Sequence, residues 1–206
     1  YGSAGVAADC FSSPVYRDYD ESWKDADYYA YNVEQAKQYL AQSDYAGEEL
    51  VLLTQSDSEL TSQATLVQAF CDAVGIKIKV EYYDTNLYTS YRDDMNYHFD
   101  LDLEYVNATY YTYELLSYLT DYTYENGTGR MRISDPELTA LYDKASAKST
   151  SNAQAVQDCL NYIKEHCYAL PVAYYTQKVF YNADKVEELG VTSDSFNPTP
   201  YTSTLK

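Results

Sequence analysis

The stretch Glu49 to Tyr83 decides the fold, and it reads ELVLLTQSDSELTSQATLVQAFCDAVGIKIKVEYY. It opens with a short apolar run typical of a buried strand, and KIKVEYY at its end is typical of a second strand. Between the two, apolar residues recur at helical spacing up to Gly75, a residue type that commonly ends helices. Two strands joined by one helix of this length predict a right-handed parallel crossover unit.

The rest of the chain continues this alternation of short strands and amphipathic helices. Asn32 with Gln35 predicts the start of a helix, Ser134 before Pro136 predicts a second, and Ser151 a third; a short helical piece is expected at about Ala4 to Phe11. We therefore predict an α/β fold with a mostly parallel sheet and helices on both faces. The strands expected in that sheet are Leu50 to Thr54, Ile76 to Tyr82, Phe99 to Glu104 and Leu170 to Tyr175.

A ligand site is expected where the strands end. In open α/β sheets, ligands bind beyond the carboxyl ends of the strands, next to helix N-termini. This rule points to the loop after the first strand and to the loop from Tyr105 to Tyr111. The candidate ligand-binding residues are Gln55, Ser56, Asp57, Tyr105, Asn107, Thr109, Tyr110 and Tyr111. Asp57 has a second interpretation, because an aspartate here can equally cap the helix that follows.

Tyrosine is the unusual component of the composition, with 27 tyrosines beside 5 phenylalanines and one tryptophan. Most of these rings are expected to cover the core and the surface. The group around Tyr105, Tyr110 and Tyr111 is different, since it crowds a strand end and a helix start. A tyrosine offers a flat apolar face and a hydroxyl, which suits a surface that is wet when empty and adhesive when occupied.

Four segments in order resemble a known family. They are YNVEQAKQYLAQSDY (Tyr31 to Tyr45), VQAFCDAVGIKIKVEYYD (Val67 to Asp84), FDLDLEYVNATYYTYELLSYL (Phe99 to Leu119), and RISDPELTALYDKASAKST with the later ALPVAYYTQKVFYN. Together they resemble the extracellular solute-binding proteins of family 5, the bacterial peptide and nickel receptors of ABC importers. The resemblance covers roughly Tyr31 to Asn182 and corresponds to the C-terminal half of a longer family member.

The resemblance implies a type II periplasmic-binding-protein-like clamshell, of which this chain would form one lobe. It further implies a substrate-binding component that delivers a peptide or small-molecule ligand to an ABC permease in the membrane. The location implied is extracellular or periplasmic, with the full-length precursor a cell-surface lipoprotein and the receptor a monomer. We expect the chain to be part of that longer precursor, because it shows no starting Met, signal peptide or lipid-attachment cysteine.

The ligand anchors of dipeptide-binding relatives are missing from the matching loops. Those relatives place an Arg after the first strand and an Asp after the later one, whereas the loops here read TQSDS (Thr54 to Ser58) and YVNATYY (Tyr105 to Tyr111). A buried charged terminus without a partner costs several kcal/mol. Hydroxyl, amide and aromatic groups remain, so an oligopeptide or other uncharged polar ligand is expected. The alternative is a stand-alone surface carbohydrate-binding or adhesion module.

Other functions find little support. A net charge of −18 repels phosphate backbones, so nucleic acid is not an expected partner. No nucleophile, base and orienting residue can be assembled, and no cofactor or metal site is expected; the pair Asp100 and Asp102 is interpreted as a solvated strand face. Disulfide pairing is left open among four cysteines, although Cys159 and Cys167 cannot pair while both lie in one helix.

The expected organisation has three parts. Residues 1–31 form an N-terminal helical and loop segment packed on the lobe, residues 32–182 form the α/β ligand-binding lobe, and residues 183–206 form a crossing segment. The acidic run RDYDESWKDAD within the first part has no strong periodicity and is interpreted as a surface loop.

Overall fold

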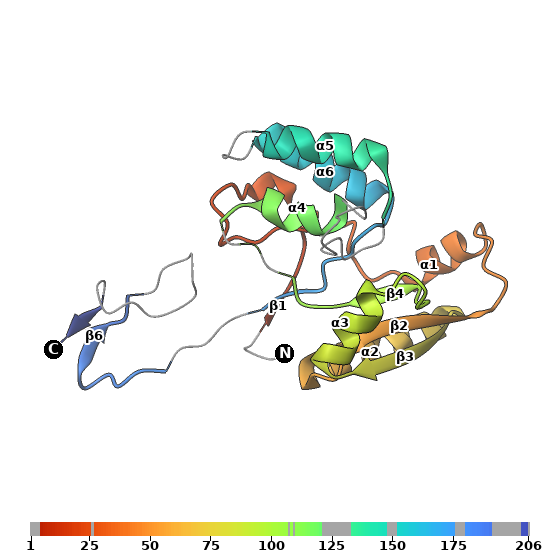
Figure 1. Cartoon of the computed structure of the whole chain (residues 1–206), viewed down its shortest axis with the longest axis horizontal. Coiled ribbons are helices and arrows are strands. Elements are labelled where there is room, and N and C mark those ends of the chain that lie inside the picture. The colour runs from red at the N-terminus through yellow and green to blue at the C-terminus, as the bar shows by residue number, and fades with distance from the viewer. Residues whose placement is uncertain are drawn as a thin grey trace. The chain divides into compact units, whose positions relative to one another are not determined.

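A computed structural model of the chain describes residues 5–25, 27–106, 108, 110–120, 133–147, 152–175, 180–190 and 203–205. The described residues fall into two compact units (Figure 1). Unit 2 lies within Asp27–Val106, and unit 1 comprises the described residues before and after that range. This division differs from the three parts expected from the sequence, and whether those parts behave as separate domains stays a prediction.

Unit 2 contains the crossover predicted from the sequence. Its elements are α1 (Val33–Leu40), β2 (Glu49–Gln55), α2 (Ser58–Val74), β3 (Lys77–Tyr83), α3 (Thr85–Asp93) and β4 (Leu101–Leu103). The three strands form one parallel sheet in the order β3-β2-β4. In the register, Leu52 of β2 pairs with Val80 of β3 on one side and with Leu101 of β4 on the other. The helix between two parallel neighbours confirms the predicted crossover.

Local sequence signals set the ends of these helices. Asp57 caps α2 by accepting hydrogen bonds from the backbone N–H groups of Glu59 and Leu60, and Asn32 caps α1 in the same way. Gly75 ends α2 with a φ of 95°, in the left-handed region that favours glycine. The predicted boundaries of the first two helices are therefore confirmed.

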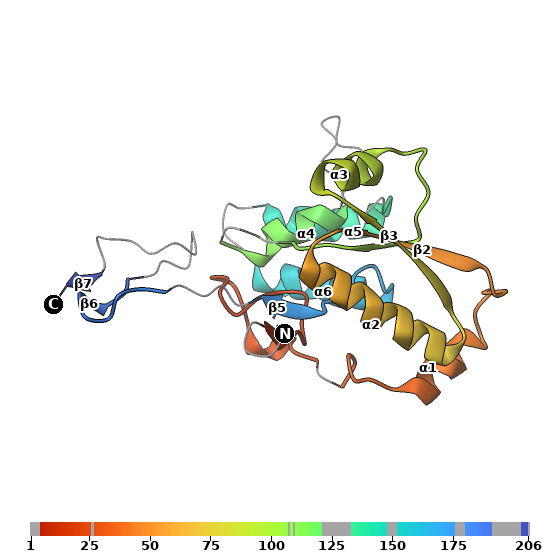
Figure 2. The same ribbon diagram turned by 90° about the horizontal axis from the view of Figure 1, so that it is seen from below.

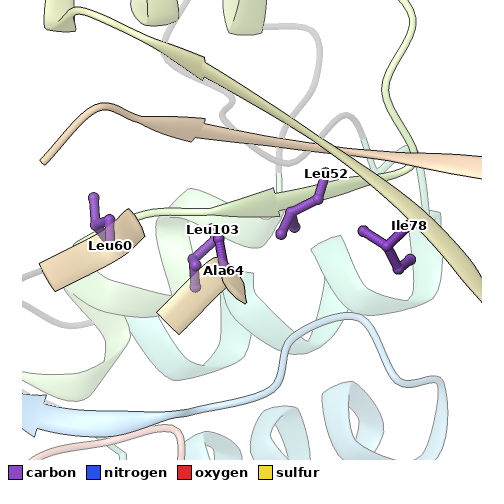
Figure 3. Packing of buried hydrophobic residues seen from close by; sticks show 5 residues of the cluster. All are labelled: Leu52, Leu60, Ala64, Ile78 and Leu103. Carbon is purple, nitrogen blue, oxygen red and sulfur yellow. The ribbon is translucent and has the colours of Figure 1, made fainter. Parts of the chain in front are cut away.

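The two faces of the sheet differ in chemistry, because successive side chains of a strand point to opposite faces. α2 packs on the apolar face through the buried cluster of Leu52, Leu60, Ala64, Ile78 and Leu103 (Figure 3). α3 lies on the other face (Figure 2), where its buried Tyr88 bonds to Asp102 of β4. The expectation of helices on both faces is confirmed for this sheet.

Unit 1 is mainly helical. It contains the 3-10 helix Glu21–Trp23, α4 (Thr112–Thr120), α5 (Pro136–Ser146) and α6 (Ala153–Glu165). The three α-helices pack together through buried apolar side chains, among them Leu116, Leu138, Val156 and Ile163. Two small antiparallel pairs complete the unit: β1 (Gly5–Ala7) with β5 (Ala173–Tyr175), and β6 (Val186–Glu188) with β7 (Thr204–Leu205).

Several expectations for unit 1 are wrong. The segment Leu170 to Tyr175 does not join the parallel sheet, because its strand β5 pairs with β1 instead. The expected helical piece at Ala4 to Phe11 contains that strand β1. These partners are far apart in sequence, and short apolar runs do not specify whether they pair locally or with a distant strand.

Two helix caps in unit 1 lie one residue later than expected. Asp135, not Ser134, caps α5 by accepting from the backbone N–H groups of Glu137 and Leu138. Asn152 caps α6 where the sequence pointed to Ser151. Asp and Asn are at least as good at this position as Ser, so composition did not separate the neighbouring candidates.

Cys10, Cys71 and Cys159 are free thiols; Cys10 and Cys159 are buried, and Cys167 is exposed. Burial is the main cause that raises the pKa of both buried thiols to about 12. Within the described ranges, every helix is too short or too polar to cross a membrane.

Candidate functional site

The carboxyl end of β2 carries three of the predicted ligand residues. Ser56 donates its backbone N–H to the carbonyl of Tyr83 at 2.7 Å, which continues the parallel pairing by one residue past the strand. The side-chain oxygen of Gln55 accepts from the Thr85 hydroxyl at 3.2 Å. Both loops that follow β2 and β3 are therefore held at one edge of the sheet, as the parallel topology requires.

Tyr105 joins this edge from the loop after β4. Its hydroxyl donates to Glu59 at 2.9 Å and reaches Asp57 at 3.3 Å, while 42% of the residue remains exposed. Asp57 caps α2 and also contacts a tyrosine of the predicted site, while its part in binding a ligand stays a prediction. Unit 2 brings together a partly exposed aromatic ring, two carboxylates and the N-terminus of a helix.

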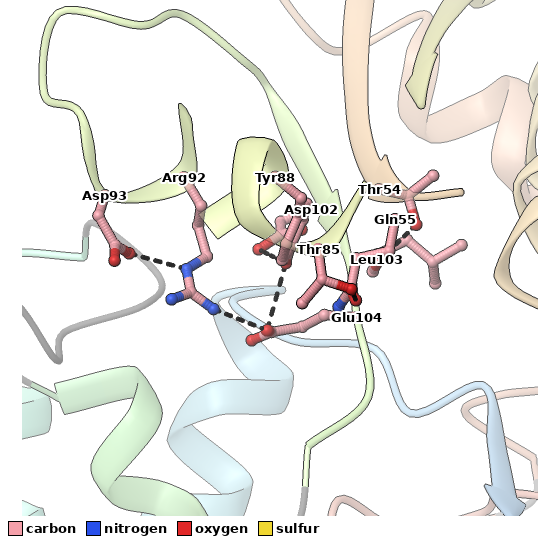
Figure 4. Close-up of polar contacts among 9 residues, drawn as sticks. All are labelled: Thr54, Gln55, Thr85, Tyr88, Arg92, Asp93, Asp102, Leu103 and Glu104. Carbon is pink, nitrogen blue, oxygen red and sulfur yellow. Dashed lines mark hydrogen bonds and ion pairs between the residues drawn. The ribbon is translucent and has the colours of Figure 1, made fainter. Parts of the chain in front are cut away.

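A polar network lies next to this edge on the α3 face of the sheet (Figure 4). The buried Tyr88 hydroxyl donates to Asp102 at 2.8 Å and lies 3.2 Å from Glu104. Arg92 also donates to Glu104 at 3.2 Å, and its guanidinium lies 5.5 Å from the centre of the Tyr88 ring. Burial, followed by the charge of Asp102, raises the pKa of Tyr88, so its hydroxyl stays protonated as a donor.

The sequence interpretation of Asp100 and Asp102 as a solvated strand face is wrong in part. Asp100 is exposed, as expected, and accepts from the backbone N–H of Val51 at 2.7 Å, but Asp102 is partly buried and accepts from Tyr88. The alternation Asp100, Asp102, Glu104 was a visible signal that one face is acidic. Only the packing of α3 against it supplies Tyr88 and Arg92 as partners.

The other predicted tyrosines belong to unit 1. The Tyr110 residue is 36% exposed, and its backbone N–H donates to Glu114 at 2.8 Å. The Tyr111 ring stacks on Tyr113 with ring centres 5.6 Å apart. These contacts hold the start of α4. Neither Tyr105 nor Tyr110 is a buried core residue, so both remain accessible for the ligand contact predicted from the sequence.

The segment Tyr16 to Asp18 is bonded to the residues that lead into α4, a contact that the sequence did not predict. Three consecutive residues of the segment bond to the loop before and at the start of α4. The Tyr16 hydroxyl accepts from the backbone N–H of Ala108 at 2.9 Å, and the Arg17 N–H donates to the Tyr110 carbonyl at 2.9 Å.

The third bond of this segment comes from Asp18. Its carboxylate accepts from the backbone N–H of Thr112 at 2.8 Å and from the Thr112 hydroxyl at 3.0 Å. The same hydroxyl lies 2.6 Å from that of Ser12, and both residues are buried. The acidic run was interpreted as a surface loop because it has no periodicity. Bonds to residues some ninety positions away leave no local signal in a sequence.

The eight predicted site residues are thus distributed over both units. Gln55, Ser56, Asp57 and Tyr105 share the edge in unit 2, Tyr110 and Tyr111 lie in unit 1, and Asn107 and Thr109 lie outside the described residues. Their joining in one concave surface stays a prediction. In the part of the chain that the structure describes, no group of three or more His, Cys, Asp or Glu side chains is arranged to hold a metal ion.

An α/β unit with a parallel sheet and polar loops at its carboxyl edge is the architecture of a ligand-binding lobe. The model of the bacterial extracellular solute-binding proteins, family 5 Middle, matches residues 1–127. This match covers more than half of the chain, and the chain therefore belongs to that family. Among curated proteins, no sequence matches it.

Solved structures share the fold at low sequence identity. HbpA2 from Haemophilus parasuis aligns with a TM-score of 0.78 at 18% identity, over 100% of this chain and 41% of that protein. The murein tripeptide binding protein MppA of Escherichia coli aligns with a TM-score of 0.70 at 18% identity, over 84% and 35%. A nickel ABC transporter protein from Bacillus halodurans aligns with a TM-score of 0.65 at 20% identity, over 93% and 42%. The chain therefore spans about two fifths of the length of these relatives.

Proposed function

We propose that this chain is one lobe of the solute-binding component of an ABC importer, and that it captures an oligopeptide or other polar ligand without chemistry. The observation that carries the proposal is the family match over residues 1–127, which includes both loops of the predicted site. Two of the solved relatives bind peptides: one is the murein tripeptide binding protein of Escherichia coli, and the other is the oligopeptide-binding protein AppA of Bacillus subtilis, solved in complex with a nonapeptide.

The residues of the two loops support a polar ligand held mainly by uncharged groups. Gln55, Ser56, Tyr105 and Tyr110 offer amide, hydroxyl and aromatic surfaces, which can bond to a peptide backbone and cover its side chains. Tyr105 is partly fixed by Asp57 and Glu59, so less side-chain freedom is lost when a ligand binds. A ligand held in this way would be bound through its backbone.

The whole receptor in this proposal is longer than the chain. A second lobe closes on the ligand, an ABC permease receives it, and the receptor is a monomeric, extracellular or periplasmic lipoprotein of a bacterium. Nucleic acid has no part in it. The lobe alone should bind the ligand weakly, because a site formed between two lobes leaves one side of the ligand exposed to water when the second lobe is missing.

A stand-alone carbohydrate-binding module is the less supported candidate. It requires an aromatic platform on an exposed sheet face. In the parallel sheet that the structure describes, α2 occupies one face and α3 the other. The partly exposed tyrosines Tyr105 and Tyr110 lie on loops instead of on a sheet face.

The test replaces one tyrosine from each unit. In the full-length receptor, Tyr105→Ala with Tyr110→Ala should weaken peptide binding at least tenfold, about 1.4 kcal/mol, in calorimetry with peptide and oligosaccharide libraries. The melting temperature should change little, because both residues are partly exposed. The control is Tyr39→Ala with Tyr181→Ala, an exposed tyrosine from each unit outside the site. Unchanged affinity in the first double variant would place the site elsewhere.

A further inference from the structure

The residues that lead into α4 present Tyr110 between two buried neighbours. Ala108 is 6% exposed and Thr112 is 0% exposed, whereas Tyr110 between them is 36% exposed. Both backbone groups of Tyr110 are bonded: its N–H donates to Glu114 at 2.8 Å, and its carbonyl accepts from the N–H of Arg17 at 2.9 Å. A predicted ligand tyrosine therefore stands on a backbone that is held on both sides.

Asp18 bonds to these residues at the point where α4 begins. Its two carboxylate oxygens accept from the backbone N–H of Thr112 at 2.8 and 3.1 Å, and one of them also accepts from the Thr112 hydroxyl at 3.0 Å. The residue before the helix is Tyr111, whose side chain is not of the Ser, Thr, Asp or Asn type that caps helices. Asp18 provides the acceptor and the negative charge that a helix N-terminus favours, from 94 positions earlier in the chain.

A further hydrogen bond fixes Thr112 from its other side. The Ser12 hydroxyl lies 2.6 Å from the Thr112 hydroxyl, and both residues are buried. Because a carboxylate only accepts, the Thr112 hydrogen points to Asp18, and Ser12 is the donor to Thr112. Loss of the Asp18 carboxylate would leave the N–H and the hydroxyl of a buried residue without this acceptor, which is costly.

We propose that Asp18 is a positioning residue of the ligand site: by holding Thr112, it fixes the backbone on which Tyr110 meets the ligand. The inference rests on the proposed function and adds to it a residue that acts through Tyr110. A backbone that is ordered before binding loses less conformational freedom when a peptide is captured. Asp18 therefore raises the affinity for the peptide.

The experiment measures peptide affinity by calorimetry on the full-length receptor. The probe is the peptide that the wild type binds most tightly in a library of nonapeptides, the length bound by the Bacillus subtilis relative. Asp18→Ala should weaken its binding about threefold to tenfold, the range expected when one or two more side chains must be ordered. Asp18→Asn should give a smaller loss, because its amide oxygen can still accept from the N–H of Thr112 without the charge.

A double-variant cycle separates positioning from a general loss of stability. In a Tyr110→Ala background, Asp18→Ala should weaken peptide binding by less than about twofold, because the ring that it positions is gone. A change that acts only by destabilising the receptor would cause the same loss in both backgrounds. If Asp18→Ala does not fold, Asp18→Asn is compared in the same two backgrounds.

Asp20→Asn is the matched control. Asp20 is an exposed aspartate of the same unit, and it caps the 3-10 helix by accepting from the backbone N–H of Ser22 at 2.8 Å. Its replacement removes the charge from a comparable cap that does not contact the residues before α4. The Kd of this variant should equal the wild-type value.

Three results would overturn the inference: wild-type affinity in Asp18→Ala, an equal loss with and without the Tyr110 ring, or unchanged affinity in Tyr110→Ala alone. A wild-type receptor that binds no peptide of the library would instead reject the proposed function, and the role of Asp18 with it. The two failures are therefore distinguishable.

Discussion

Tyr88→Phe should destabilise unit 2, although it removes a single oxygen atom. Tyr88 is 1% exposed, and its hydroxyl is the donor that Asp102 accepts at 2.8 and 3.0 Å and that Glu104 approaches at 3.2 Å. The variant leaves two carboxylates near one another with one donor fewer. Arg92 still bonds to Glu104, so the loss falls mainly on Asp102.

The magnitude follows from the kind of bond. A hydrogen bond to a charged group contributes about 1.5–3 kcal/mol net, and removing one partner leaves the other desolvated. Asp102 is only partly buried, which allows some access to water and favours a value of about 2 kcal/mol. For a chain of this size, that loss lowers the Tm by about 4–8 °C.

The assay is urea unfolding monitored by circular dichroism, repeated with Asp102→Asn and with the double variant. The cycle should show coupling between the two residues, because they share one bond. Tyr39→Phe is the control, since its exposed hydroxyl accepts a long bond from Gln35 at 3.3 Å. A Tyr88→Phe protein as stable as this control would refute the argument that the acidic face depends on the tyrosine.

Three further predictions concern single residues. The hydrogen bond from the Tyr168 hydroxyl is the main cause that lowers the pKa of Asp135 from 3.8 to about 2. The ionised Asp135 carboxylate should therefore stabilise the fold above about pH 4, and this stabilisation should be lost as the pH falls through about 2. Asp135→Asn should lower the Tm at neutral pH and flatten the dependence of the Tm on acid pH. Gly75→Ala should cost about 1–2 kcal/mol in urea unfolding because its φ of 95° strains an L-residue, and a loss below about 0.3 kcal/mol would contradict this. In thiol labelling of the folded chain, exposed Cys167 should react first and buried Cys10 only on unfolding, so that Cys167→Ser removes the fast phase.

The parallel crossover in unit 2 could be predicted because its signals are local. The apolar run of β2, the helical spacing of α2 and the glycine at its end each depend on residues a few positions apart. The same holds for the caps at Asn32 and Asp57, and for the rule that places a site at the carboxyl ends of the strands. These features require no knowledge of how distant segments meet.

Tertiary structure alone decided which distant segments are partners. β5 pairs with β1 across most of the chain, and Asp102 is partly buried and bonded to the Tyr88 hydroxyl. The bonds of Arg17 and Asp18 to the loop that begins α4 likewise join residues more than ninety positions apart. A strand of three residues or a single carboxylate can bond to many partners at almost equal free energy. The packing of whole helices and sheets selects one of them, and that selection leaves no periodic pattern in the amino-acid sequence.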